Sequence, residues 1–139
     1  MIDKRLFRIR TFWVILFLVP VGFLSKIYSG PGQLWVNHSL GGVLYEIFWC
    51  LVVSGFRPAL KAKKIALGVF YVTCMLEFMQ LWHPAFLESF RRLFIGRTLL
   101  GTTFTWTDFP YYFLGSLAGA FLIEQLKKSA AFSENTDRQ

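Results

Sequence analysis

Four long apolar runs, separated by short polar connections, occupy most of this chain. They lie at about 11–28, 34–56, 65–82 and 104–126. A helix needs roughly 20 predominantly apolar residues to cross the hydrocarbon core of a bilayer, and each run approaches or exceeds that length. The sequence therefore predicts an all-α membrane protein with four transmembrane helices in a single domain, residues 1–126, followed by a polar cytoplasmic tail at 127–139.

The first run resembles a signal peptide because basic residues precede it. Lys26, however, stands where small residues would lead to a cleavage site. We interpret the run as a retained signal-anchor helix.

Basic residues give the chain a formal net charge of +7, and they gather in short clusters between the apolar runs. This distribution is typical of membrane topology signals rather than of a nucleic-acid interface. With four spans, three clusters fall on one side, so the positive-inside rule predicts a multi-pass protein of the inner (plasma) membrane with both termini in the cytoplasm. The three clusters are Lys4, Arg5, Arg8 and Arg10; Arg57, Lys61, Lys63 and Lys64; and Lys127, Lys128 and Arg138.

The segment before the fourth run is predicted to be a short amphipathic helix at about 84–95, lying at the outer interface. Pro84 suits its first turn and Gly96 its end. Arg91 and Arg92 on this helix are expected either to meet lipid phosphates or to contribute to a binding site near the buried acids. Arg97 follows the helix, and we expect it to fold back towards buried acids, since a guanidinium binds a carboxylate or phosphate through two parallel hydrogen bonds.

Three carboxylates interrupt the apolar runs: Glu46, Glu77 and Asp108. A carboxylate inside a bilayer costs at least a few kcal/mol unless it is paired, protonated or facing water. Glu77 and Gln80 share one helix face, and both lie, like Asp108 and His38, in the outer half of the predicted bundle. Glu46 is expected separately, nearer the midplane.

The candidate ligand-binding set rests on this convergence of polar side chains in apolar surroundings. Alternatives stay open, because Glu77 could be a purely structural carboxylate and Asp108 a helix N-cap. The set comprises Glu77, Gln80, Arg97, Asp108, Tyr112 and Glu46.

The fourth run carries a regular polar and glycine face. Asp108, Tyr112, Gly115 and Gly119 follow one another at helical spacing, and the G-x-x-x-G element predicts close approach of a neighbouring helix.

The two cysteines, Cys50 and Cys74, lie in apolar runs and do not have the spacing of metal ligands. We therefore expect them to have packing roles, and we expect no metal and no cofactor.

The string E77-x-x-Q80, the arginines that follow and D108-x-x-x-Y112-x-x-G115 resemble the VanZ-like membrane proteins. The longer strings GGVLYEIFW, LEFMQLW and GRTLLGTTFTWTDFPYYFLG resemble a bacterial domain-of-unknown-function family of small membrane proteins, sometimes labelled ribosomal maturation proteins. The resemblance covers about 34–126. It implies a link to the cell envelope and to glycopeptide resistance, although Tyr112 stands where VanZ-like sequences usually carry Asn. The ribosomal label fits poorly with four spans.

Three functions follow as hypotheses. The first is a non-enzymatic protein that binds an outer-leaflet lipid, a lipid-linked envelope precursor or an amphiphilic antibiotic. The second is an enzyme on a lipid-linked substrate, with Glu77 and Asp108 as general acid and base. The third is a proton-coupled transport component that uses Glu46. The first is favoured; no nucleic acid is expected as a partner, and homo-oligomerisation stays open.

Overall fold

The computed structural model describes residues 3–100 and 103–136, and in that part of the chain the regular structure is entirely helical. The all-α fold class is therefore confirmed. The elements in chain order are α1 (Lys4–Ile27), α2 (Gln33–Trp35), the π-helical η1 (Val36–Leu40), α3 (Gly41–Phe56), α4 (Ala62–Met79), α5 (Ala85–Arg92), α6 (Phe94–Leu100) and α7 (Asp108–Thr136).

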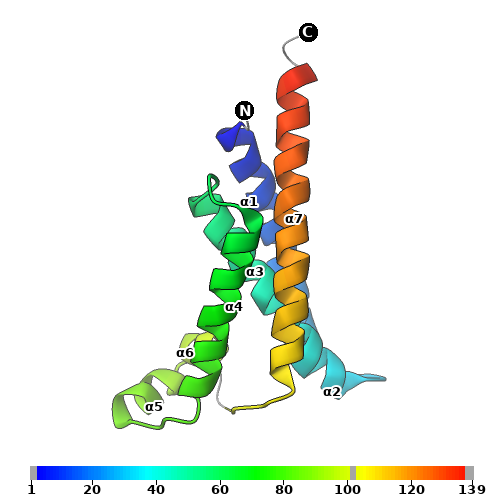
Figure 1. Cartoon of the computed structure of the whole chain (residues 1–139). Coiled ribbons are helices and arrows are strands. Elements are labelled where there is room, and N and C mark those ends of the chain that lie inside the picture. The colour runs from blue at the N-terminus through cyan, green and yellow to red at the C-terminus, as the bar shows by residue number, and fades with distance from the viewer. Residues whose placement is uncertain (1–2, 101–102, 137–139) are drawn as a thin grey trace.

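The long helices α1, α3, α4 and α7 run alongside one another, and both termini lie at the same end of the bundle (Figure 1). The connection from α3 to α4 lies at this end too, which we call the terminal end. The elements α2, α5 and α6 lie at the opposite end (Figure 1). Helix α3 contacts each of the other three long helices, so it forms the centre of the bundle.

Basic residues join separate segments at the terminal end. Arg8 Nε donates to the Gly55 carbonyl at 3.1 Å, and Arg10 donates to the Ser133 hydroxyl at 2.8 Å. Lys127 Nζ donates to the carbonyl of Leu60, in the α3–α4 connection, at 2.5 Å. The structure thus brings the three basic clusters to one end, apart from Arg138, which lies outside the described residues. The side of a membrane that this end faces stays a prediction.

Two helical stretches of the described residues are long and apolar enough to cross a membrane: Lys4–Ile27 and the continuous stretch Gln33–Phe56. Length and composition alone support this statement. The other two long helices carry more polar residues, among them Lys63, Lys64 and Glu77 in α4. The count of four spans therefore stays a prediction.

The ends of the first and fourth helices differ from the sequence prediction. α1 begins at Lys4, before the apolar run, because Asp3 caps it: the Asp3 carboxylate accepts hydrogen bonds from Arg5 N at 2.8 Å and Leu6 N at 3.2 Å. α7 begins at Asp108 and continues to Thr136, where the sequence predicted only a polar tail. The extension is held in the bundle, since Ala130 is completely buried and Ser133 accepts the hydrogen bond from Arg10.

The short helix predicted at about 84–95 is present as α5, but it ends at Arg92 and a second short helix, α6, follows it. Leu93 adopts an extended conformation, with φ −73° and ψ 143°, between α5 and α6. Gly96 lies inside α6 rather than at a helix end. It packs directly on the Phe90 carbonyl, where a side chain would have no space. The close turn of α6 against the end of α5 therefore requires this glycine.

Close packing of α7 on α3 confirms the role predicted for the G-x-x-x-G element. A Cβ atom built on Gly115 would lie 2.6 Å from Glu46 Cβ and 2.8 Å from the Val43 carbonyl oxygen. One built on Gly119 would lie 2.8 Å from Cys50 Cβ. Both glycines are thus required for the distance between the two helices.

We predict that Gly115→Ala lowers the free energy of unfolding by about 1–3 kcal/mol, because an extra methyl group in a filled interior forces side chains and backbone to shift. Reversible unfolding in detergent micelles measures the change. Gly68→Ala is the matched control, since a Cβ on Gly68 in α4 meets no atom within 4 Å. Equal stability of the Gly115→Ala variant and the wild type would contradict this packing.

Candidate ligand-binding site at the buried carboxylates

Glu77, in the last turn of α4, joins the end of that helix to the start of α7. Its carboxylate is only 2% exposed and accepts hydrogen bonds from Gln80 Nε2 at 2.8 Å, Tyr112 OH at 3.0 Å and the backbone N–H of Thr105 at 2.9 Å. All three donors are neutral. The predicted proximity of Glu77, Gln80 and Tyr112 is thus present, while their role in binding stays a prediction.

Gln80 leaves an acceptor without a partner in this cluster. Its side chain is 7% exposed, and its amide nitrogen is used by Glu77. Its Oε1 atom is buried and has no hydrogen-bond partner among the described residues. A buried polar atom without a partner is uncommon and calls for an explanation. This oxygen could accept a hydrogen bond from a ligand.

Glu46 in α3 is completely buried and contacts the same helix as Glu77. Its Oε1 accepts a hydrogen bond from the Ser116 hydroxyl at 2.8 Å, whereas its Oε2 has no partner among the described residues. Ser116 follows Tyr112 by four residues, so the contacts of the two carboxylates on α7 are about 6 Å apart along the helix axis. Glu46 thus lies about one helical turn further along α7 than the Glu77 cluster, and its depth in a membrane stays a prediction.

Asp108 is the first residue of α7 and lies at the same end of the bundle. Its backbone N–H donates to the Thr105 carbonyl at 3.1 Å. His38 and Lys26 lie close enough to act on its charge, and Asp108 itself acts on Glu77. The convergence of Asp108, His38 and Glu77 in one binding site stays a prediction.

Arg97 is not among the hydrogen-bond partners that the described residues give Glu77. It is exposed on α6, and the position next to Glu77 where the sequence predicted a guanidinium is taken by the backbone N–H of Thr105. Because the segment leading into α7 closes over the carboxylate, Arg97 is not its partner in this structure. Its guanidinium stays accessible.

Arg91 is the arginine that the fold uses, a role that the sequence did not reveal. It is 4% exposed and donates to the carbonyl oxygens of Met79 at 3.0 Å and Trp82 at 3.1 Å, at the end of α4. It also donates to Glu88 Oε1 at 3.0 Å. A basic side chain on the last carbonyls of a helix satisfies groups that have no partner within the helix. Arg91 thus fixes α5 to the end of α4.

Glu88 completes this connection. His83 Nδ1 lies 2.7 Å from Glu88 Oε1. The hydrogen bond with His83, followed by that with Arg91, lowers the pKa of the Glu88 carboxyl below its usual value. The spacing of Glu88 and Arg91, three residues apart on a predicted helix, is the sequence signal that could have indicated the pair.

An aromatic cluster adjoins Glu77 at this end of the bundle. The ring centroids of Phe104 and Trp106 are 4.9 Å apart, those of Phe78 and Phe109 are 5.6 Å apart, and those of Trp106 and Phe109 are 5.7 Å apart. Trp106 is 70% exposed. Tryptophan and other aromatic residues are enriched where a membrane meets water, so the cluster is typical of an interfacial position.

Within residues 3–100 and 103–136, no three His, Cys, Asp or Glu side chains are grouped so that they could hold a metal ion. Ser116, the partner of Glu46, was also missed by the sequence analysis. Its place four residues after Tyr112, on the face with the glycines, was the available signal.

The model of a protein family described as "Protein of unknown function (DUF2809)" matches residues 32–116. The matched region runs from α2 into α7 and includes Glu46, Glu77, Asp108 and Ser116. No curated protein and no solved structure matches the chain.

We predict that Arg91→Ala lowers the free energy of unfolding by about 1.5–3 kcal/mol, because hydrogen bonds to a charged group are lost and buried carbonyls are left without a partner. Unfolding in detergent, followed by circular dichroism, measures the loss. Arg92→Ala is the control, since Arg92 is the adjacent, exposed residue of the same helix. Equal stability of the two variants would contradict the structural role of Arg91.

Proposed function

The chain belongs to the DUF2809 family, and we propose that it is an integral membrane protein that binds the head group of an amphiphile at the end of the bundle opposite its termini. The occupant is an outer-leaflet lipid, a lipid-linked envelope precursor or an amphiphilic antibiotic. The buried acceptor on Gln80, beside Glu77, is the observation that carries this proposal.

Exposed apolar side chains support insertion into a bilayer. On α1, Phe12, Trp13 and Phe17 are 61%, 62% and 73% exposed. Apolar surface in water is unfavourable by roughly 25 cal/mol per Å², and large exposed apolar patches mark protein or membrane contacts. We propose that α4 and α7 cross the bilayer together with α1 and the stretch Gln33–Phe56. The basic terminal end then faces the cytoplasm, as expected in the plasma membrane.

The proposed head-group site combines two kinds of group. Gln80 Oε1 supplies a free acceptor for a hydroxyl or amine of the ligand, next to the carboxylates of Glu77 and Asp108. Arg92 and Arg97 are exposed on α5 and α6 at the same end, as Figure 1 shows for these two helices. Guanidinium groups suit phosphate recognition. A phosphate with a neighbouring hydroxyl or amine is the head group that these residues fit.

The similarity to VanZ-like sequences supports an envelope setting for this proposal. Its two elements, E77-x-x-Q80 and D108-x-x-x-Y112, supply residues of the cluster around Glu77. Envelope homeostasis or tolerance of amphiphilic antibiotics is therefore the role that we propose. Ribosomal maturation is not part of it.

Proton-coupled transport is the second candidate, because Glu46 is completely buried and one of its oxygens has no partner among the described residues. Proton flux in liposomes that is lost in Glu46→Gln would favour it. Catalysis by Glu77 and Asp108 is less well supported, since three hydrogen bonds from the chain itself occupy the Glu77 carboxylate.

The proposed topology predicts opposite labelling of two cysteines introduced into a chain with Cys50 and Cys74 replaced by alanine. Ser29→Cys, between α1 and α2, should react with an impermeant thiol reagent added to intact cells. Ala59→Cys, in the α3–α4 connection, should react only after the membrane is opened. Both positions are exposed, so accessibility within the protein is matched. Labelling of both in intact cells, or recovery of the chain without membranes, would contradict the topology.

The head-group site predicts that Arg97→Ala weakens binding of a phosphate-bearing amphiphile by about tenfold or more, the loss of one hydrogen bond to a charged group. Two short-chain probes in non-ionic detergent, phosphatidylethanolamine and phosphatidylinositol, supply an amine and hydroxyls respectively. Isothermal titration calorimetry measures their affinities.

Arg5→Ala is the control for this experiment, because Arg5 is an exposed arginine in the first turn of α1, at the terminal end and outside the candidate site. Its affinities should equal those of the wild type. Absence of saturable binding of both probes, or the same loss in both variants, would contradict the proposed site.

A further inference from the structure

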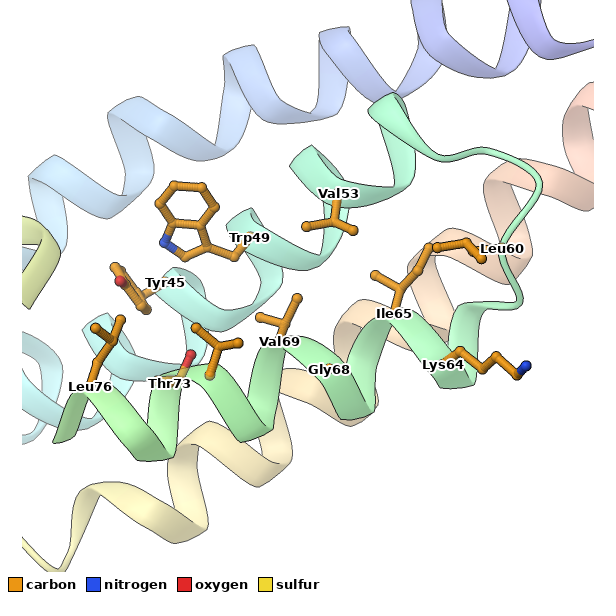
Figure 2. A pocket seen from close by; sticks show the side chains of 11 residues that line it. Tyr45, Trp49, Val53, Leu60, Lys64, Ile65, Gly68, Val69, Thr73 and Leu76 are labelled. Atoms are coloured by element: carbon orange, nitrogen blue, oxygen red, sulfur yellow. The ribbon is translucent and has the colours of Figure 1, made fainter. Parts of the chain in front are cut away.

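A groove of about 560 Å³ runs between α3 and α4. Its lining is apolar along most of its length and includes Trp49 and Val69. Figure 2 shows Lys64 and Leu60 at one end, next to the α3–α4 connection, and Tyr45 and Leu76 at the other. The groove thus begins at the basic terminal end of the bundle and follows the helices inward.

The dimensions of the groove fit a single hydrocarbon chain. Lys64 and Leu76 are twelve residues apart in α4, which corresponds to about 18 Å along the helix. One leaflet contributes about 15 Å to the hydrocarbon core of a bilayer. The groove is therefore long enough to hold one acyl chain within a single leaflet.

Charge distinguishes the two ends of the groove. Lys64 is the charged residue of its lining, and Figure 2 shows its amine pointing outward at the end of the groove. Arg57 and Lys61, in the same connection, are also exposed. Basic residues next to a membrane surface attract anionic lipid head groups. The apolar groove therefore has a basic rim at one end, and this rim attracts phosphate groups.

We propose that the groove holds one acyl chain of an anionic phospholipid from the leaflet at the terminal end, with the phosphate at Lys64. This site is separate from the head-group site around Glu77, and it rests on the membrane insertion proposed above. The bound lipid covers apolar side chains between α3 and α4 that the chain leaves open.

Two substitutions address the two parts of the site. Gly68 lines the groove, and a side chain built there meets no atom within 4 Å, so Gly68→Leu fills the groove without displacing the protein. Gly22→Leu is its matched control, because Gly22 in α1 is equally open and does not line the groove. Lys64→Gln removes the charge at the rim, and Lys63→Gln is the control for charge alone.

The test is native mass spectrometry of each variant released from vesicles of equal parts phosphatidylglycerol and phosphatidylcholine. All variants are also made in the Arg97→Ala background, so that lipid at the head-group site does not contribute. The wild type should retain lipid and prefer phosphatidylglycerol severalfold. Gly68→Leu should retain at least tenfold less, while Gly22→Leu retains as much as the wild type. Lys64→Gln should lose the preference, and Lys63→Gln should keep it.

Equal retention by Gly68→Leu and the wild type would overturn the proposal. Loss of a dimer in Gly68→Leu without loss of lipid would assign the groove to a second copy of the chain instead. If Gly68→Leu does not fold, an unchanged phosphatidylglycerol preference in Lys64→Gln overturns the proposal that the groove holds an anionic phospholipid. The cysteine labelling at positions 29 and 59 reports separately on membrane insertion, so its failure can be told from failure of this inference.

Discussion

Close approach of α7 to α3 is the constraint on which the rest of the structure depends. It requires Gly115 and Gly119, because a side chain at either would collide with α3. At this distance the Ser116 hydroxyl reaches Glu46, and one turn earlier on the same helix Tyr112 reaches Glu77. Two buried carboxylates are thus partnered by one helix. Wider separation would leave both without those hydrogen bonds in an apolar interior, which is costly.

Hydrogen bonds from neutral groups hold the Glu77 carboxylate, and this explains how the end of the bundle is assembled. A carboxylate in an apolar setting needs donors, and the backbone N–H of Thr105 is one of them. The segment that leads into α7 is therefore tied to the end of α4. Arg91 ties α5 to the same helix end through the Met79 and Trp82 carbonyls. The two connections meet at the end of α4, where Gln80 Oε1 has no hydrogen-bond partner among the described residues.

Much of the fold could be predicted from the sequence, because it depends on local patterns. The apolar runs and basic clusters predicted helices with both termini at one end, and the glycine spacing predicted the α3–α7 contact. The break at Leu93 and the extension of α7 depend on contacts between distant segments, such as Arg10 with Ser133. The choice of Arg91 rather than Arg97 as the buried arginine likewise follows from how α6 turns back at Gly96, which periodicity does not reveal.

Arg91 and Arg97 differ in burial, and this difference decides which of them is available to a ligand. Arg91 is buried, and its terminal nitrogens donate to carbonyls and to Glu88, while its Nε has no hydrogen-bond partner among the described residues. Arg97 is exposed, and Glu77 does not need it because neutral donors satisfy that carboxylate. A guanidinium in this position retains its full capacity for a phosphate. The expectation that Arg97 neutralises Glu77 is therefore replaced by the proposal that Arg97 meets the phosphate of the head group and Gln80 its hydroxyl or amine.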